Sequence, residues 1–490
     1  MSKSLFVSVA RHSTYNIAGA VVPIGISLVL TPALIHFVGI ARYGLLSIFW
    51  ILLGYLGFFD FGTGRAVAQR IASLRHDTHE RRNQAFWTSL SMCILLCAVA
   101  AIIVVAGLPL IARFLSIDTS LAAELHAALY WLVPAVPLIM IASQFSGALE
   151  GAERFGFVNL VSVLTSAASL ALPLLAAIFI APTLQVLAGA ATLGRLLGVI
   201  ALAAGAVVLL PVCRPSFDRH DAGKLLSFGG WNTISRVVAP ILVTFDRFLI
   251  GRLLGAAATG IYALPFSLML QMQLFPAAVN RALFPKMAAA SAAGAPDGSE
   301  ETIALFNFVI TCTLVLAAPL ILPFFWLWVG PETGTASSPV AYALMPGIWV
   351  NSLATVTATA LVARANTRFL ALVHLSEVVP FLLLLYAAIH FFGIVGAGLA
   401  WSFRCAVDAA IIFGWQKVPL QKVPIALSGG GILAISVISL LLPSSDPLRW
   451  ILVIGVGGLT LWQAWVWRPP LARAYEQRFF MALRRRSWGR

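Results

Sequence analysis

Charged residues are scarce in this sequence. They make up only 10% of its 490 residues, whereas 60% of the residues are hydrophobic, and the mean hydropathy is +0.94. A soluble domain typically carries about 25% charged residues, and a soluble protein as apolar as this one would expose large patches and aggregate. The composition therefore excludes a cytosolic enzyme, a disordered chain and a secreted disulfide scaffold, and it predicts a polytopic membrane protein.

Cysteines are few as well. The sequence has five, Cys93, Cys97, Cys213, Cys312 and Cys405, and none of them forms a CxxC or Cys/His metal pattern. Most of them fall inside apolar runs. We therefore expect them to be small buried hydrophobic residues that form no disulfide.

Motifs that mark covalent chemistry are also missing. The sequence contains no GxxxxGK(S/T) loop for ATP, no HExxH or GxSxG motif and no aspartate cluster for a metal. The longest predicted outer connections, 112–123 and 330–339, are too short to form a domain. These absences predict a protein that is not an enzyme and that uses no cofactor or metal.

Long apolar runs are what the sequence does contain. They lack the period-2 alternation of membrane strands and so favour spanning helices over a barrel, the two structures that lipid admits. Breaking the sequence at charged and Pro/Gly-rich connections predicts an all-α polytopic membrane protein of about 14 transmembrane helices. The predicted spans are 14–38, 44–64, 86–111, 124–147, 157–180, 184–210, 225–250, 260–283, 303–329, 340–363, 369–392, 394–416, 425–443 and 450–467.

Basic residues outnumber acidic ones, 32 to 18, which gives a net charge of +14. If the N-terminus is cytoplasmic, alternating spans place most Lys and Arg residues on the cytoplasmic side, as the positive-inside rule requires. We therefore predict that both termini are cytoplasmic and that 14–38 is a first span rather than a cleaved signal peptide. The charge excess then needs no nucleic-acid partner, and the basic tail 468–490 is expected to lie on the inner leaflet.

The sequence also contains signs of an internal repeat. When it is shifted by 216 residues, Gly39 and Gly44 fall on Gly255 and Gly260, each pair at a connection between two predicted spans. Six spans separate the copies, so the two copies would run parallel, a plan known among transporters. The predicted organisation is a six-helix lobe at 14–210, a second at 225–416, two additional helices at 425–467 and the tail at 468–490.

Four stretches carry a resemblance to a known family. They are GIARYGLLSIFWILLGYLGFFDFGTGRAVAQRIA (39–72), ALEGAERFG (148–156), FDRFLIGRLLGAAATGIYALPFSLM (245–269) and LFPKMA (283–288). They resemble the Wzx-type polysaccharide and O-antigen flippases of the multidrug/oligosaccharidyl-lipid/polysaccharide (MOP) exporter superfamily.

The resemblance implies a function as well as a fold. It implies two lobes in a bacterial inner membrane that move an undecaprenyl-pyrophosphate-linked oligosaccharide outward by alternating access, for cell-surface polysaccharide biosynthesis. The implied partners are this lipid-linked substrate, the membrane lipids and a glycan-assembly complex. Since the sequence has no ATP motif, the driving force would be an H⁺ or Na⁺ gradient or the substrate gradient.

Charged residues inside the predicted spans are the candidate substrate site, because an ionisable group in hydrocarbon is costly unless it faces water or a partner. Arg195, Arg236 and Arg404 lie near the middle of their spans. Arginine binds phosphate oxygens through two hydrogen bonds, so we predict that these three line a central cavity. A structural role remains the alternative, above all for Arg404, which has Asp408 four residues further on the same helix face.

The other internal charges are candidates for gating or ion coupling, namely Asp60, Asp246, Arg247, Glu377 and Asp408. Asp60 and the Asp246–Arg247 pair fall at predicted span ends, where capping a helix is the structural alternative. Glu377 lies beside His374, and a carboxylate in a low-dielectric site has a raised proton affinity that could couple proton movement to transport.

Three other functions remain open at this point. A multidrug or cation antiporter of the same superfamily would need an acidic chamber, which the sequence lacks. A membrane-embedded polysaccharide polymerase or ligase would need a sizeable periplasmic loop, and none is predicted. A non-transporting scaffold of a glycan-assembly complex would have no need of deep arginines.

Overall fold

The computed structural model describes residues 3–60, 62–74, 77–114, 119–209, 219–293, 298–364, 366–416 and 422–470. Within these ranges all regular structure is helical, which confirms the all-α prediction. The chain divides into two compact units, Met1–Gly260 and Ile261–Arg490, and each is described by itself.

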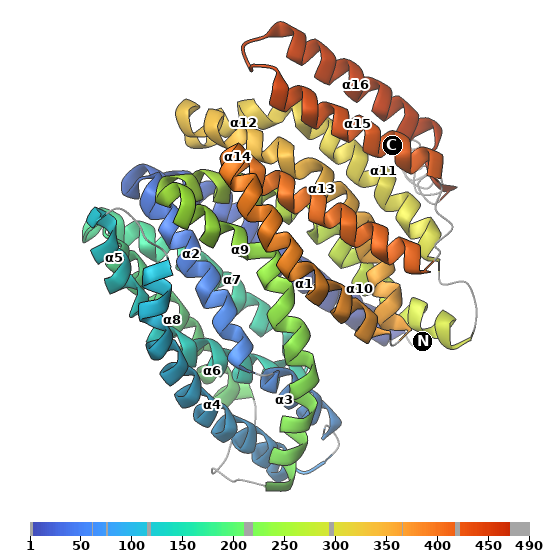
Figure 1. Ribbon diagram of the computed structural model, residues 1–490. Coiled ribbons are helices and arrows are strands. Elements are labelled where there is room, and N and C mark those ends of the chain that lie inside the picture. The colour runs from blue at the N-terminus through green and yellow to red at the C-terminus, as the bar shows by residue number, and fades with distance from the viewer. Residues whose placement is uncertain are drawn as a thin grey trace, which may run out of the picture. The chain divides into compact units, whose positions relative to one another are not determined.

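The first unit is a bundle of packed helices, drawn in blue to green in Figure 1. Its helices are α1 (Lys3–Val38), α2 (Ile40–Leu56), the short η1 (Gly57–Asp60), α3 (Thr63–Ser73), α4 (His79–Phe114), α5 (Thr119–Leu129), α6 (Leu132–Gly151), α7 (Phe155–Phe179), α8 (Leu184–Leu209) and most of α9 (Arg219–Gln271). Helix α6 lies against α3, α4 and α8, so it forms the centre of this unit.

The second unit begins within the last turns of α9. It continues with α10 (Leu274–Ala292), α11 (Ser299–Ala317), η2 (Ala318–Leu320), α12 (Ile321–Val329), α13 (Pro331–Ala363), α14 (Thr367–Gln416), α15 (Lys422–Leu441) and α16 (Pro447–Val466). Helix α13 packs against α10, α11, α12, α14 and α15, so it is the central helix of this unit (Figure 1).

Eleven helical stretches of the described chain are long and apolar enough to cross a membrane. Two of them bend sharply, because the backbone leaves helical geometry at Gly255 (φ 88°) and at Gly393 (φ 58°), and each bend divides its stretch into two halves. Helix α2 is apolar but only 17 residues long. Counting both halves of the two bent stretches and adding α2 recovers the fourteen predicted spans.

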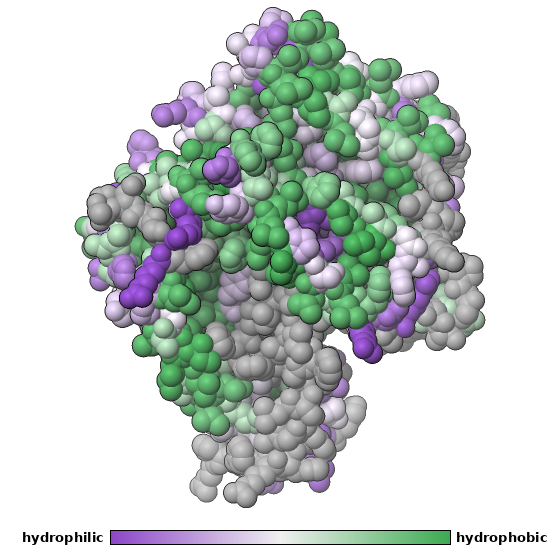
Figure 2. All heavy atoms as spheres, in the orientation of Figure 1, coloured by the Kyte–Doolittle hydropathy of each residue, from purple (hydrophilic) through white to green (hydrophobic). Residues whose placement is uncertain are grey.

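Apolar side chains cover much of the visible surface in Figure 2. Leu327 is 90% exposed and Phe179 is 78% exposed. So many large apolar side chains would be unfavourable in contact with water, but they are favourable in contact with lipid hydrocarbon. These surfaces are therefore those of a multi-pass membrane protein. Of the cysteines, Cys93, Cys97 and Cys405 are buried as predicted, Cys312 is half-buried, and Cys213 lies outside the described residues.

The repeated glycines create one very close helix crossing. Gly39 and Gly255 both take positive φ values, 81° and 88°, which only glycine adopts readily. Just after them, Gly44 lies against the carbonyl oxygen of Ala256, and Gly260 lies against that of Ile40. The two contacts are reciprocal; the parallel repeat and the lobe boundaries remain predictions.

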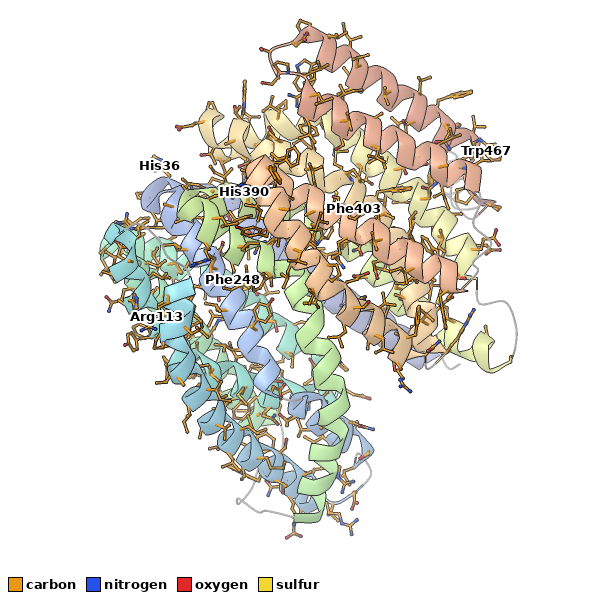
Figure 3. All side chains as sticks on the ribbon, in the orientation of Figure 1. His36, Arg113, Phe248, His390, Phe403 and Trp467 are labelled. Atoms are coloured by element: carbon orange, nitrogen blue, oxygen red, sulfur yellow. The ribbon has the colours of Figure 1, made fainter. Side chains whose placement is uncertain are left out.

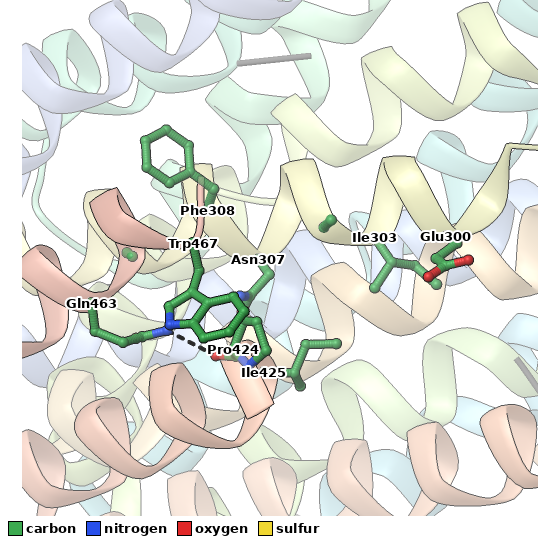
Figure 4. A pocket seen from close by; sticks show the side chains of 10 residues that line it. Glu300, Ile303, Asn307, Phe308, Pro424, Ile425, Gln463 and Trp467 are labelled. Atoms are coloured by element: carbon green, nitrogen blue, oxygen red, sulfur yellow. Dashed lines mark hydrogen bonds between the residues drawn. The ribbon is translucent and has the colours of Figure 1, made fainter. Parts of the chain in front are cut away.

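The last two helices are attached to the second unit by a buried polar network. Asn307 of α11 donates to the hydroxyl of Ser428 of α15 (3.2 Å) and accepts from the indole of Trp349 of α13 (3.1 Å). Gln463 of α16 donates to the carbonyl of Pro424 (3.4 Å; Figure 4). These bonds hold α15 and α16 against α11 and α13.

Candidate functional site

Arg195 lines a half-open cavity in the first unit. Helices α6, α7 and α8 line this cavity of about 250 Å³, which offers the hydroxyls of Ser146, Ser162, Thr165 and Ser166 together with Arg195; Ser162 and Ser166 lie on its exposed side. A space of this size holds several water molecules and therefore also a phosphate group. Its apolar lining comes from the same three helices, so the polar groups form one spot within an apolar environment.

Most polar groups of this cavity have no partner among the described residues; Ser166 is the exception, because its hydroxyl donates to the carbonyl of Ser162 (2.8 Å). Nε of Arg195 is buried without a hydrogen-bond partner, and no described acid pairs with the guanidinium. The hydroxyls of Ser146, Ser162 and Thr165 also have no hydrogen-bond partner among the described residues. A desolvated cation without a counter-ion is unfavourable, and an anion held by these donors would relieve that cost.

Arg404 lies in a second cluster of charges, inside α14. This helix folds back at Gly393, so its two halves pack side by side; Figure 3 labels His390 before the turn and Phe403 after it. Nη1 of Arg404 lies 3.3 Å from Oε2 of Glu377, and Nε2 of His374 lies 3.7 Å from Oδ1 of Asp408. The fold-back therefore brings together three of the predicted residues and His374.

The partners in this cluster differ from those nearest in sequence. Arg404 bonds with Glu377 of the other half of α14 rather than with Asp408 one turn away. His374 faces Asp408 rather than Glu377. Arg404 is thus ion-paired, which is the structural alternative that its sequence allowed, whereas Arg195 has no such pair within the part of the chain that the structure describes.

Asp60 is buried and caps a helix. Its Oδ1 accepts from the hydroxyl of Thr63 and from the backbone N–H of Gly64 (3.2 Å), both in the first turn of α3. Its Oδ2 accepts from Ser143 of α6 (2.6 Å). The network continues from Thr63 through Gln144 of α6 to Ser89 of α4, so Asp60 ties α3, α4 and α6 together.

Replacing Asp60 with alanine is expected to lower the free energy of unfolding by about 2 kcal/mol, because the cap and the bond to Ser143 are both lost. Asp60→Asn, which keeps an accepting oxygen, should have a smaller effect. Thermal unfolding of the purified protein in detergent would measure both, with Glu332→Ala as the control because Glu332 is exposed. Equal loss in the alanine and asparagine variants of Asp60 would contradict the capping role.

Asp246 and Arg247 are both buried near the end of the first half of α9, beside Phe248, which Figure 3 labels. Oδ1 of Asp246 accepts from the backbone N–H of Arg247 (2.7 Å). Next to them, the hydroxyls of Tyr55 and Thr244 lie 2.5 Å apart. The contact between these hydroxyls joins α2 to α9; the gating role of Asp246 and Arg247 remains a prediction.

Arg236 lies on α9, but its side chain is outside the described residues. Arg195 belongs to the first unit and Arg404 to the second, and each is described within its own unit. Their convergence on one cavity therefore remains a prediction.

Sequence reasoning missed one strong ion pair in the first unit. Arg42 of α2 donates two hydrogen bonds to Glu124 of α5 (2.9 and 2.7 Å), and Glu124 also accepts from the backbone N–H of Leu184 at the start of α8 (2.9 Å). Both residues lie at predicted span ends, where interfacial charges are ordinary. Their pairing depends on the packing of three helices, which periodicity does not reveal.

The fold and these internal charges define a multi-pass membrane protein with polar sites enclosed by apolar helices. The chain belongs to the family described as "Polysaccharide biosynthesis protein", which matches residues 9–291. A relative from Shigella flexneri named "Putative O-antigen transporter" is 27% identical over 410 residues, which cover 83% of this chain and 97% of that protein.

Solved structures show the same fold. The lipid II flippase MurJ in an inward closed conformation matches with a TM-score of 0.69 at 13% identity, over 93% of this chain and 99% of that one. An inward-facing multidrug resistance MATE family transporter of the MOP superfamily matches with a TM-score of 0.66 at 15% identity, over 84% and 99%. These relatives are named transporters or flippases and not enzymes. The protein is a membrane transporter with a MOP-type fold, which confirms the resemblance seen in its sequence.

Proposed function

We propose that the protein is a flippase that moves a polyprenyl-pyrophosphate-linked oligosaccharide from the cytoplasmic to the periplasmic leaflet of a bacterial inner membrane. The family and the name of the Shigella flexneri relative support a role in surface polysaccharide export. The polyprenyl chain stays in lipid, the charged headgroup passes along the protein interior, and the lobes open alternately to the two sides.

The observation that carries this proposal is the unpaired Arg195 in its hydroxyl-lined cavity. Its planar guanidinium binds two phosphate oxygens at once, and the free serine and threonine hydroxyls supply further donors. Arg236 is the second proposed contact for the headgroup. Arg404 is neutralised by Glu377, which favours a supporting role for it over direct substrate binding.

The same cavity disfavours a multidrug or cation antiporter. A cationic drug would meet the Arg195 guanidinium without any described acid beside it, and like charges repel strongly at low dielectric. The buried acids of the second unit, Glu377 and Asp408, are engaged by Arg404 and His374. An anionic cargo is therefore the better match.

Arg195→Ala is expected to reduce polysaccharide export by about tenfold to a hundredfold, since a hydrogen bond to a charged group contributes about 1.5–3 kcal/mol. The measurement is the amount of surface polysaccharide in a strain that lacks its own O-antigen flippase and carries the variant. Arg195→Lys keeps the positive charge but loses the planar guanidinium that binds two oxygens at once, so it should retain part of the activity. Arg236→Ala is expected to behave like Arg195→Ala.

The matched control is Arg113→Ala, which removes an exposed arginine from the last turn of α4 (Figure 3). It should export normally. Protein abundance is measured for every variant by immunoblot of the membranes. Normal export by an abundant Arg195→Ala protein would exclude Arg195 as a headgroup contact.

A further inference from the structure

Four ionisable side chains meet where the two halves of α14 pack together. The carboxyl groups of Glu377 and Asp408 lie close enough to affect each other electrostatically. Arg404 bonds to Glu377 at 3.3 Å, and His374 lies 3.7 Å from Asp408. We call these four residues the α14 cluster. Three of its members are buried, with side-chain exposures of 7% for Glu377, 8% for Asp408 and 9% for Arg404.

The charges of the α14 cluster do not balance without a proton. If both carboxyls are ionised and His374 is neutral, two negative charges face one positive charge, and one negative charge is left over. Two ionised carboxylates held close together in an apolar environment are also strongly unfavourable. One added proton, on a carboxyl or on the imidazole, makes the cluster neutral and allows the carboxyls to share a hydrogen bond.

Nothing else in the described surroundings supplies the missing positive charge. Arg404 also contacts Sγ of Cys405 (3.2 Å) and the ring of Phe381, which bring no positive charge. Helix α13, which packs against α14, has two titratable residues, Glu332 and Tyr342. Glu332 is exposed, and Tyr342 is buried with its hydroxyl donating to the carbonyl of Ala318 (3.0 Å).

Two carboxyl oxygens remain available for the proton. Oε1 of Glu377 and Oδ1 of Asp408 are buried and have no hydrogen-bond partner among the described residues. His374 is the most accessible member of the cluster, with 28% of its side chain exposed. It is therefore placed to receive a proton from outside the cluster and pass it inward.

We propose that the α14 cluster is a proton-binding site that couples a proton gradient to transport, a proposal that rests on the flippase function proposed above. His374 takes up a proton, and its Nε2–H gives that proton to Asp408, which leaves a neutral imidazole. The protonated carboxyl then donates to Glu377, and Arg404 balances the remaining charge. Loss of the proton restores an uncompensated negative charge between the halves of α14 and favours their rearrangement about Gly393.

Infrared spectroscopy of the purified protein tests proton binding without any substrate. A protonated carboxylic acid has its own C=O stretching band, which disappears when the group ionises. We expect one buried band that fades with rising pH in the wild type and is absent in both Glu377→Gln and Asp408→Asn. Both variants should fold, because each amide keeps the shape of the acid and removes the excess charge. The band should persist in the matched control, Glu332→Gln.

Two infrared results would overturn the proposal. If the band survives in both amide variants, the carboxyls of the cluster do not hold the proton. If sodium chloride at constant pH removes the band, in comparison with choline chloride, the site selects sodium rather than protons.

Coupling is tested in vesicles of phosphatidylethanolamine and phosphatidylglycerol that enclose a pH-sensitive dye. Undecaprenyl pyrophosphate is the added probe, and its passage between leaflets is followed in parallel with the internal pH. The wild type and Glu332→Gln should change the internal pH as the lipid moves, whereas Glu377→Gln and Asp408→Asn should not. Lipid movement without a pH change in the wild type would refute coupling. If the lipid does not move at all, the flippase proposal fails, while the infrared result still decides proton binding.

Discussion

Replacing Arg404 with leucine is expected to lower the free energy of unfolding by about 3–5 kcal/mol, the usual effect of removing one partner from a buried ion pair. The leucine leaves the buried carboxyls of Glu377 and Asp408 near each other without their cation. Thermal unfolding of the purified protein, at acidic and at alkaline pH, measures the effect. The loss should be smaller at acidic pH, because protonation removes the uncompensated charge.

The control for this prediction is a double variant. Arg404→Leu combined with Glu377→Leu removes one charge of each sign and leaves Asp408 beside His374. Replacing a whole buried pair by apolar groups is often neutral, so the double variant should be more stable than Arg404→Leu alone. If the two proteins are equally unstable, packing rather than charge explains the role of Arg404.

Leucine at Gly44 is expected to destabilise the first unit by about 3 kcal/mol or more, in the upper range for overpacked sites. Even a Cβ atom at this position would overlap the backbone carbonyl of Ala256, which cannot rotate away. The helices would have to separate at the crossing that small residues allow. The measurement is the yield and thermal unfolding of the purified variant.

Gly54 provides the matched control, because it lies on the same helix, is exposed, and leaves open space within 4 Å of the position that a Cβ atom would occupy. Gly54→Leu should be tolerated. By the reciprocity of the crossing, Gly260→Leu should be as damaging as Gly44→Leu. A stable Gly44→Leu protein would mean that the crossing is loosely packed.

Hydropathy was sufficient to predict the spans, because each spanning helix satisfies its own backbone and must be apolar over its whole length. It also predicted separate helices on the two sides of Gly255 and Gly393, which the merged helices α9 and α14 contain. These features are local, so a single sequence reveals them.

The partners of the internal charges could not be predicted in this way. Glu377 and Arg404 are 27 residues apart and meet only because α14 folds back at Gly393. The nearest acid in sequence, Asp408, was the partner in the structural alternative for Arg404, and it instead faces His374. Which side chains meet across two helices depends on their rotation about their axes, and apolar positions on all sides of a membrane helix leave that rotation undetermined.

The serine and threonine hydroxyls around Arg195 could not be predicted for a related reason. Serine and threonine are common in membrane helices, so Ser162 and Thr165 carried no signal until α7 was placed opposite Arg195. The same holds for Ser143 and Gln144, which reach Asp60 and Thr63 from α6. Arg195 itself was found because a charge in an apolar span is rare.

The most direct test of the transport claim is a reconstituted assay with a purified polyprenyl-pyrophosphate-linked oligosaccharide. The protein is placed in vesicles, and a soluble glycosidase or lectin added outside detects the glycan that has crossed from the inner leaflet. Wild type and Arg113→Ala should transfer the glycan, whereas Arg195→Ala should leave it inside. Transfer by Arg195→Ala at the wild-type rate, or no transfer by the wild type, would contradict the account.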